Sequence, residues 1–100
     1  MSSQLKNLSD YDASGISAKG LRFGIVVSSW NKEVTEALYD GACETLLALG
    51  ADSGNIIRKD VPGSYELPLA AKWTAESIKP DAVICLGCVI QGETRHFDFI

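Results

Sequence analysis

Two short segments of the chain combine residue types that can hold a small organic molecule. Trp30 and Asn31 provide a flat aromatic face next to an amide, which suits stacking on a heterocycle and hydrogen-bonding to its edge. The run Gly63-Ser64-Tyr65-Glu66 provides backbone N–H groups and one carboxylate, which can grip a polyhydroxy chain. Each segment also has an ordinary interpretation, in which Trp30 packs on its own helix, Asn31 caps that helix and Glu66 is a solvated turn residue.

A third segment combines a candidate anion site with the one histidine of the chain. Glu93 and Thr94 precede a predicted helix start, where N–H groups and a hydroxyl at the positive end of the helix dipole stabilise a phosphate. His96 follows two residues after Thr94, and histidine is the side chain that titrates near neutral pH without help from its surroundings. His96 is therefore a candidate for proton transfer, with a surface or capping role as the alternative.

The three cysteines, Cys43, Cys85 and Cys88, predict reduced thiols in place of a disulfide framework. Cys85 and Cys88 form a C-x-x-C, which has to be weighed as a redox or metal site. Residues three apart on a strand point to opposite faces, and the sequence has no second pair to complete a zinc site, so packing thiols are expected. The glycine motifs that bind NTPs and dinucleotides, and the G-x-S-x-G of α/β-hydrolases, do not occur in the sequence.

Composition and charge predict a globular protein that acts on small molecules. The chain has 100 residues, of which 46% are hydrophobic, and a formal net charge of -4. No apolar run approaches the roughly 20 residues of a membrane span, and the polar N-terminus is unlike a signal peptide. No face dense in lysine and arginine is available for nucleic acid. We therefore expect a cytoplasmic protein that binds neither a membrane nor nucleic acid.

Apolar patterning predicts three strands after an irregular N-terminal arm at residues 1–20. The β-branched run 23–28 is typical of a strand that is covered on both faces. Shorter strands are predicted at 55–59, where polar residues indicate a sheet edge, and at 82–86. Residues 21–100 are therefore expected to form an α/β domain.

Two helices are predicted to connect these strands. The first is indicated by apolar residues three or four apart, at positions 34, 37, 38, 41, 42, 45, 46 and 49. The second starts near Ser64, which can cap it, accepts Pro68 in its first turn and ends before Pro80. Strand–helix–strand repeats form right-handed crossovers and a parallel sheet, and ligands bind beyond the carboxyl ends of its strands, where the three candidate segments lie.

The three segments also occur in an order that resembles the lumazine synthase family. The sequence has Ser-Trp-Asn after the first strand, Val-Pro-Gly-Ser-Tyr-Glu-Leu-Pro after the second and Gly-Cys-Val-Ile-Gln-Gly-Glu-Thr-Arg-His-Phe-Asp after the third. The resemblance covers nearly the whole chain from about residue 5. It implies a three-layer α/β/α sandwich with a flavodoxin-like parallel sheet of strand order 2-1-3-4, whose fourth strand is absent from this sequence.

This resemblance implies a transferase of riboflavin biosynthesis. Members of the family act as 6,7-dimethyl-8-ribityllumazine synthases, which condense 5-amino-6-(D-ribitylamino)uracil with 3,4-dihydroxy-2-butanone 4-phosphate and release phosphate and water. They use no metal and no organic cofactor. By resemblance, the pyrimidine and its ribityl chain would be bound by Trp30, Asn31, Ser64, Tyr65, Glu66, Val89 and Ile90, and the phosphate by Glu93 and Thr94. His96 would move protons in the reaction.

The resemblance also implies assembly. Family members form homo-pentamers, often twelve of them in a 60-subunit icosahedral shell, and their N-terminal arm adds to the sheet of a neighbouring subunit. They continue beyond this sequence with a fourth strand and further helices, so the domain is expected to be incomplete at its C-terminal end. Three alternatives stay open: a flavin-pathway relative such as the archaeal type of riboflavin synthase, a non-catalytic shell protein that binds flavin or lumazine, and an inactive truncated fragment.

Overall fold

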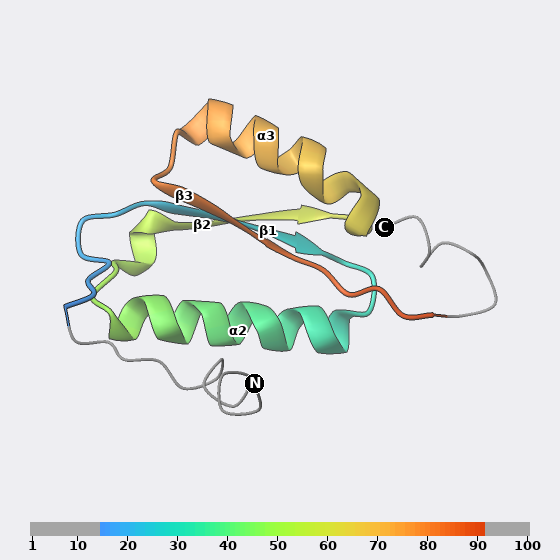
Figure 1. Cartoon of the computed structure of the whole chain (residues 1–100), viewed down its shortest axis with the longest axis horizontal. Coiled ribbons are helices and arrows are strands. Elements are labelled where there is room, and N and C mark those ends of the chain that lie inside the picture. Colours follow the sequence, from blue (N-terminus) through green and yellow to red (C-terminus); the bar gives the residue numbers. More distant parts are fainter. Residues whose placement is uncertain (1–14, 92–100) are drawn as a thin grey trace, which may run out of the picture.

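The computed structural model of the chain describes residues 15–91 and contains a parallel sheet between two helices (Figure 1). Along the chain the elements are β1 (Phe23–Ser28), α2 (Lys32–Ala48), the 3-10 turn η1 (Ser53–Asn55), β2 (Ile56–Val61), the 3-10 turn η2 (Ser64–Glu66), α3 (Leu67–Ile78) and β3 (Ala82–Leu86). The predicted alternation of strands and helices is confirmed, although β2 starts and ends later than the predicted 55–59. Most of the predicted arm, and the segment with Glu93, Thr94 and His96, lie outside the described residues.

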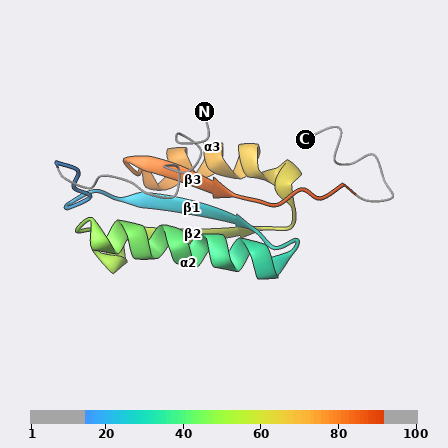
Figure 2. The same cartoon turned by 60° about the horizontal axis from the view of Figure 1, so that its bottom comes forward.

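The three strands are parallel and lie in the order β2-β1-β3, so β1 is central and β2 is an edge strand. The register pairs Ser28 with Val61 on β2 and Val27 with Leu86 on β3, which brings the carboxyl ends of all three strands to one edge of the sheet. Figure 2 shows α2 on one face of the sheet and α3 on the other. The predicted three-layer sandwich with a flavodoxin-like sheet is thereby confirmed for the strands that are present.

The central strand forms the buried middle of the sandwich. All six residues of β1 are buried, and Ile25, Val26 and Val27 have no exposed surface. A strand with helices on both faces buries every side chain, which explains its continuous apolar run. At the amino ends of the strands, a further apolar cluster consists of Ala18, Phe23 and Ala51, with Leu46, Leu49 and Ile56 packed against it.

The helix α3 packs on the sheet through the face that its sequence predicts, with Thr74 buried. Pro68 lies in its first turn, and Lys79 adopts a left-handed conformation (φ 48°) directly before Pro80. The predicted cap is wrong, because Ser64 begins the 3-10 turn η2 and neither that turn nor α3 receives a side-chain capping bond. Within residues 15–91, no helix combines the length and the apolar character that crossing a membrane requires.

The helix α2 turns a different face to the sheet from the one its apolar spacing predicts. Val34 and Leu38 belong to the predicted stripe, yet they are 40% and 43% exposed, whereas Thr35 is fully buried. The C-terminal half of the helix follows the prediction, because Leu46 and Leu49 pack against the apolar cluster. The error therefore lies in the N-terminal half of the helix.

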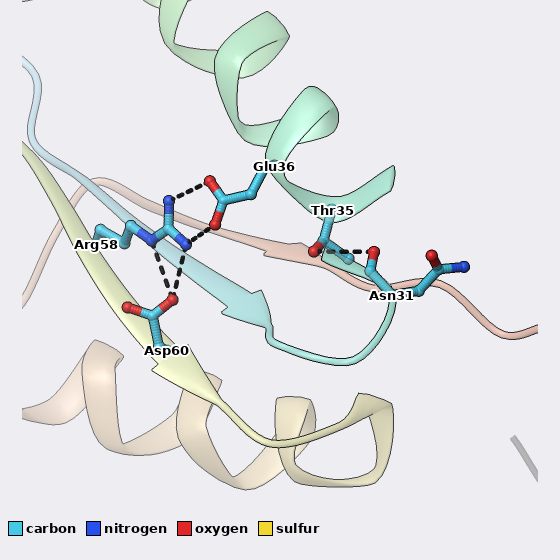
Figure 3. Close-up of polar contacts among 5 residues, drawn as sticks. All are labelled: Asn31, Thr35, Glu36, Arg58 and Asp60. Carbon is cyan, nitrogen blue, oxygen red and sulfur yellow. Dashed lines mark hydrogen bonds and ion pairs between the residues drawn. The ribbon is translucent and has the colours of Figure 1, made fainter. Parts of the chain in front are cut away.

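A polar contact with β2 accompanies this orientation of α2 (Figure 3). The guanidinium of Arg58 donates to both carboxylate oxygens of Glu36, at 2.9 and 2.5 Å, and to Oδ1 of Asp60 at 2.8 and 3.1 Å. It also lies 4.5 Å from the centre of the Tyr39 ring. Glu36 and Tyr39 are three residues apart on one side of the helix, and these contacts require that side to face β2.

The Glu36–Arg58 pair predicts a pH-dependent contribution to stability. The hydrogen bond that Arg58 donates to the Glu36 carboxylate holds the pKa of Glu36 below the ordinary value of 4.5. A carboxyl group whose pKa is lower in the folded than in the unfolded protein stabilises the fold at any pH above its ordinary pKa. This stabilisation is lost as the pH falls through the pKa of the folded state. Glu36→Gln is therefore expected to lower Tm by a few degrees at neutral pH, and the difference from wild type should shrink as the pH falls below 4.5 and vanish once Glu36 is protonated in the folded protein.

Thermal unfolding monitored by circular dichroism measures this difference across the pH range. Glu44→Gln is the matched control, because Glu44 is exposed on the same helix and forms no ion pair within the described part of the chain. A Tm difference for Glu36→Gln that stays the same in acid would show that the pair does not stabilise through its charge.

Candidate functional site

The carboxyl ends of β1 and β2 are joined beyond the strands by backbone hydrogen bonds. The N–H of Ser29 donates to the carbonyl oxygen of Val61 at 2.7 Å, and the N–H of Trp30 donates to that of Pro62 at 3.1 Å. These bonds extend the parallel ladder past the last strand residues. The first candidate segment, Trp30-Asn31, therefore lies directly beside the start of the second.

The second and third candidate segments meet at Gly87, the residue that follows β3. A Cβ added to Gly87 would lie 2.8 Å from Ser64 Oγ and 2.8 Å from Leu67 Cδ1, closer than side chains approach one another. Because glycine has no Cβ, the chain that leaves β3 can pass directly against Ser64 and the start of α3. The half-buried Ser64 thus lies between the loops that follow β2 and β3.

The first and third segments are joined by a side-chain contact. Asn31 Nδ2 donates a hydrogen bond to Cys88 Sγ at 3.4 Å, across 57 positions of sequence. Each of the three segments therefore contacts the other two at the carboxyl edge of the sheet. Ligands of open α/β sheets bind at this edge.

Large side chains at this edge are available for contact with a ligand. Trp30, Tyr65 and Ile90 are 51%, 51% and 55% exposed. The carboxylate of Glu66 is also exposed and folds back over Gly63, with Oε1 3.7 Å from the place a Cβ would occupy there. An exposed ring, a carboxylate and a glycine-lined turn can together hold a flat heterocycle with a polar chain.

The structure bears on the ordinary interpretation of Trp30-Asn31 in two ways. Half of the Trp30 surface is exposed, so a large part of the ring is accessible to solvent. Asn31 occupies the N-cap position of α2, but its side chain makes no capping bond and reaches Cys88 instead. Both groups are thus presented at the carboxyl edge. Val89 is half-buried beside them, and the predicted phosphate and proton-transfer residues Glu93, Thr94 and His96 lie outside the described residues.

The cysteines are all free thiols, as predicted. Cys85 is exposed on β3, and partial burial raises the pKa of its thiol, which makes that group less reactive at neutral pH. Cys88 makes its contact with Asn31 and forms no bond to Cys85. Between residues 15 and 91, no three histidine, cysteine or acidic side chains gather in a metal-binding arrangement.

A groove of about 330 Å³ lies elsewhere, between β2 and α3. Its lining includes Lys59, Ser77 and Trp73, and the Trp73 side chain is 60% exposed. None of the site residues predicted from the sequence lines it. The groove is therefore a separate surface feature that offers an internal control for experiments on Trp30.

Two residues at the carboxyl edge are missed by reasoning from the sequence. The sequence predicts a packing role for Cys88 and no particular role for Gly87, yet these residues supply the contacts of the third segment with the other two. Their position in the sequence could have indicated this role, because Gly87 and Cys88 directly precede Val89 and Ile90 in the motif that carries the family resemblance.

These features define an α/β sandwich of flavodoxin-like topology whose candidate ligand site is built from three loops at the carboxyl edge of the sheet. The sequence model of the 6,7-dimethyl-8-ribityllumazine synthase family matches residues 20–100. The chain belongs to this family.

Similar curated proteins carry the same name. A 6,7-dimethyl-8-ribityllumazine synthase of Cytophaga hutchinsonii is 59% identical over 100 residues, which cover 100% of this chain and 63% of that protein. Those of Flavobacterium psychrophilum and Flavobacterium johnsoniae are each 54% identical over 101 residues, which cover 100% of this chain and 53% of each relative. The chain thus spans between about half and two thirds of the length of these relatives.

Proposed function

We propose that the complete protein is a transferase that condenses 5-amino-6-(D-ribitylamino)uracil with 3,4-dihydroxy-2-butanone 4-phosphate to give 6,7-dimethyl-8-ribityllumazine. One observation carries the proposal: the three segments that hold the family's motifs meet at one edge of the sheet through Ser29–Val61, Gly87–Ser64 and Asn31–Cys88 contacts. Family membership supports the same reaction, because the relatives are named for it.

The proposed site divides between the two substrates. Trp30 stacks on the pyrimidine, Asn31 hydrogen-bonds at the same end, and backbone groups of Val89 and Ile90 contact the ring edge. Ser64 and Tyr65 line the pocket, and Glu66 accepts hydrogen bonds from the ribityl hydroxyls. Glu93 and Thr94 bind the phosphate of the second substrate.

The proposed reaction needs no covalent bond to the protein and no metal or organic cofactor. The pyrimidine amine attacks the ketone, and loss of water gives an imine. Elimination then releases phosphate, and the ribitylamino nitrogen closes the second ring with loss of a second water. Both substrates are reactive, so holding them together in the right orientation supplies most of the rate enhancement.

His96→Ala is expected to slow turnover of the complete protein by about 10- to 100-fold without abolishing it, because general acid–base catalysis adds only a modest factor to proximity. The measurement is steady-state product formation, with binding of a non-reacting pyrimidine analogue by calorimetry as the control for site integrity. Undetectable turnover in a variant that still binds the analogue would contradict the dominant role of proximity.

We also propose that residues 21–100 belong to the catalytic domain, that residues 1–20 form an arm, and that the protein works in the cytoplasm as a homo-pentamer or a 60-subunit shell of pentamers. It binds neither nucleic acid nor membranes. The support is the family membership together with the net charge of -4. Native mass spectrometry of the complete protein should give subunits in multiples of five, and a monomer would contradict the assembly.

The proposed activity is tested by mixing the complete protein with both substrates. Absorbance of the lumazine product and release of inorganic phosphate should rise together in a 1:1 ratio. A folded protein that makes no product would refute the proposal. If that protein nevertheless bound flavin tightly, the non-catalytic binding role would take its place.

A further inference from the structure

Asn31 has a backbone conformation that needs support from its surroundings. Its φ and ψ are both 59°, in the left-handed region that few residues other than glycine adopt. Asparagine tolerates this region better than most residues, but it does not enforce it. The orientation of its side chain therefore depends on the contacts around it.

The carbonyl of Asn31 is fixed from the side of α2 (Figure 3). It accepts hydrogen bonds from the N–H groups of Val34 and Thr35, each at 3.1 Å, and from Thr35 Oγ1 at 3.4 Å. Thr35 has no exposed surface, so this anchor is part of the packed interior. These bonds hold the backbone, and they leave rotation about the side-chain bonds of Asn31 undetermined.

The side chain is held from the side of β3. Cys88 Sγ, two residues after the end of that strand, accepts from Asn31 Nδ2 at 3.4 Å. This is the one hydrogen bond that the Asn31 amide makes among residues 15–91. Within that part of the chain, Oδ1 and the second amide proton of Asn31 make no hydrogen bond, and groups of this kind can hydrogen-bond the edge of a heterocycle.

We propose that Cys88 is a positioning residue that orients the Asn31 amide toward the heterocyclic substrate. The identity of the substrate rests on the proposed function. The orientation of the amide rests on the hydrogen bond between Asn31 and Cys88. Cys85 provides a contrast within the same strand region, because it is exposed and its side chain makes no hydrogen bond among the described residues.

The first test is a double-mutant cycle on the steady-state kinetics of the complete protein. Cys88→Ala removes the acceptor and should raise KM for the ribitylaminouracil about fivefold, the value of one neutral hydrogen bond, with kcat within twofold of wild type. Cys88→Ser keeps a hydrogen-bonding atom and should restore KM to within twofold. In an Asn31→Ala background, Cys88→Ala should have no further effect, because its partner is gone.

Cys85→Ala is the matched control for the loss of a thiol and should leave KM unchanged. An unchanged KM in Cys88→Ala would overturn the proposal. So would an equal loss in Cys88→Ser, or a further rise in KM when Cys88→Ala is added to Asn31→Ala, because each shows that Cys88 acts by packing and not through Asn31.

The second test reads the contact without enzyme activity. Iodoacetamide labelling followed by peptide mass spectrometry compares the rates at which Cys88 and Cys85 are alkylated. In Asn31→Ala, Cys88 should be labelled several times faster than in wild type, while the rate at Cys85 stays constant. Equal rates at Cys88 in both proteins would refute the contact. A wild-type protein without synthase activity would refute the proposed function, and the labelling result would still decide whether Asn31 and Cys88 interact.

Discussion

Trp30→Ala is expected to weaken binding of the ribitylaminopyrimidine by about 5- to 150-fold, because stacking of a base on an aromatic ring contributes about 1–3 kcal/mol. The ring follows the buried strand β1 and keeps half of its surface exposed at the carboxyl edge. Its backbone N–H donates a hydrogen bond to the carbonyl oxygen of Pro62, which fixes the backbone that carries the ring. Isothermal titration of a non-reacting analogue into the complete protein measures the effect.

The sequence supplies a matched control for this experiment. Trp73 is also strongly exposed, at 60%, but it lines the groove between β2 and α3. Trp73→Ala should leave the Kd of the analogue unchanged, and Trp30→Phe should recover most of the affinity that Trp30→Ala loses. Equal losses from the two alanine variants would show that the effect is a general one on folding, and wild-type affinity in Trp30→Ala would remove the residue from the site.

Gly24→Ala is expected to lower the free energy of unfolding by about 1–3 kcal/mol through overpacking. A Cβ at Gly24 would lie 2.6 Å from Thr74 Cγ2, with Ile78 Cδ1 at 3.5 Å and Pro80 Cγ at 3.8 Å. Thr74 is 4% exposed and its branched side chain has few χ1 rotamers, so it has little room to move aside. The midpoint of urea unfolding, followed by circular dichroism, reports the loss.

A second substitution tests whether this contact is the cause. Thr74→Ser removes Cγ2, and Gly24→Ala combined with Thr74→Ser should therefore recover most of the stability relative to Thr74→Ser alone. Gly54→Ala is the control, because nothing lies within 4 Å of the added Cβ and its stability should change little. If the Gly24→Ala loss were just as large in the Thr74→Ser background, the close packing of α3 on β1 could not be its cause.

The strands were open to prediction because their causes are local, whereas their order was implied by the family resemblance. The run 23–28 is apolar at every position, which only a strand covered on both faces requires, and the polar end of β2 marks an edge. The parallel arrangement then follows from the helices between the strands. This reasoning also identified the carboxyl edge, and with it the place where Trp30 and Ser64 come together.

The face of α2 was not open to prediction from apolar spacing. Val34 and Leu38 extend the apolar stripe, but in the structure the side of the helix that carries Glu36 and Tyr39 contacts Arg58 of β2. Arg58 lies on another element, 22 positions from Glu36, so the pairing depends on the assembled fold. Spacing along one helix carries no information about such a partner.

The contact between Asn31 and Cys88 was hidden for a related reason. It requires the left-handed backbone of Asn31 and the register of β3 against β1, and only the assembled sheet sets both. A C-x-x-C draws attention to thiol chemistry, whereas the structure gives Cys88 a hydrogen bond to an amide. The roles of Glu93, Thr94 and His96 stay predictions from the family motif.

The most direct test of the central claim, that the three loops form one substrate site, is a crystal structure of the complete protein with a non-reacting ribitylaminopyrimidine analogue. We expect the pyrimidine ring to stack on Trp30, to be hydrogen-bonded to Asn31 and to contact the Val89 backbone, with the ribityl chain at Glu66. An analogue bound in the groove beside Trp73, or a carboxyl edge left empty at saturating concentration, would contradict it.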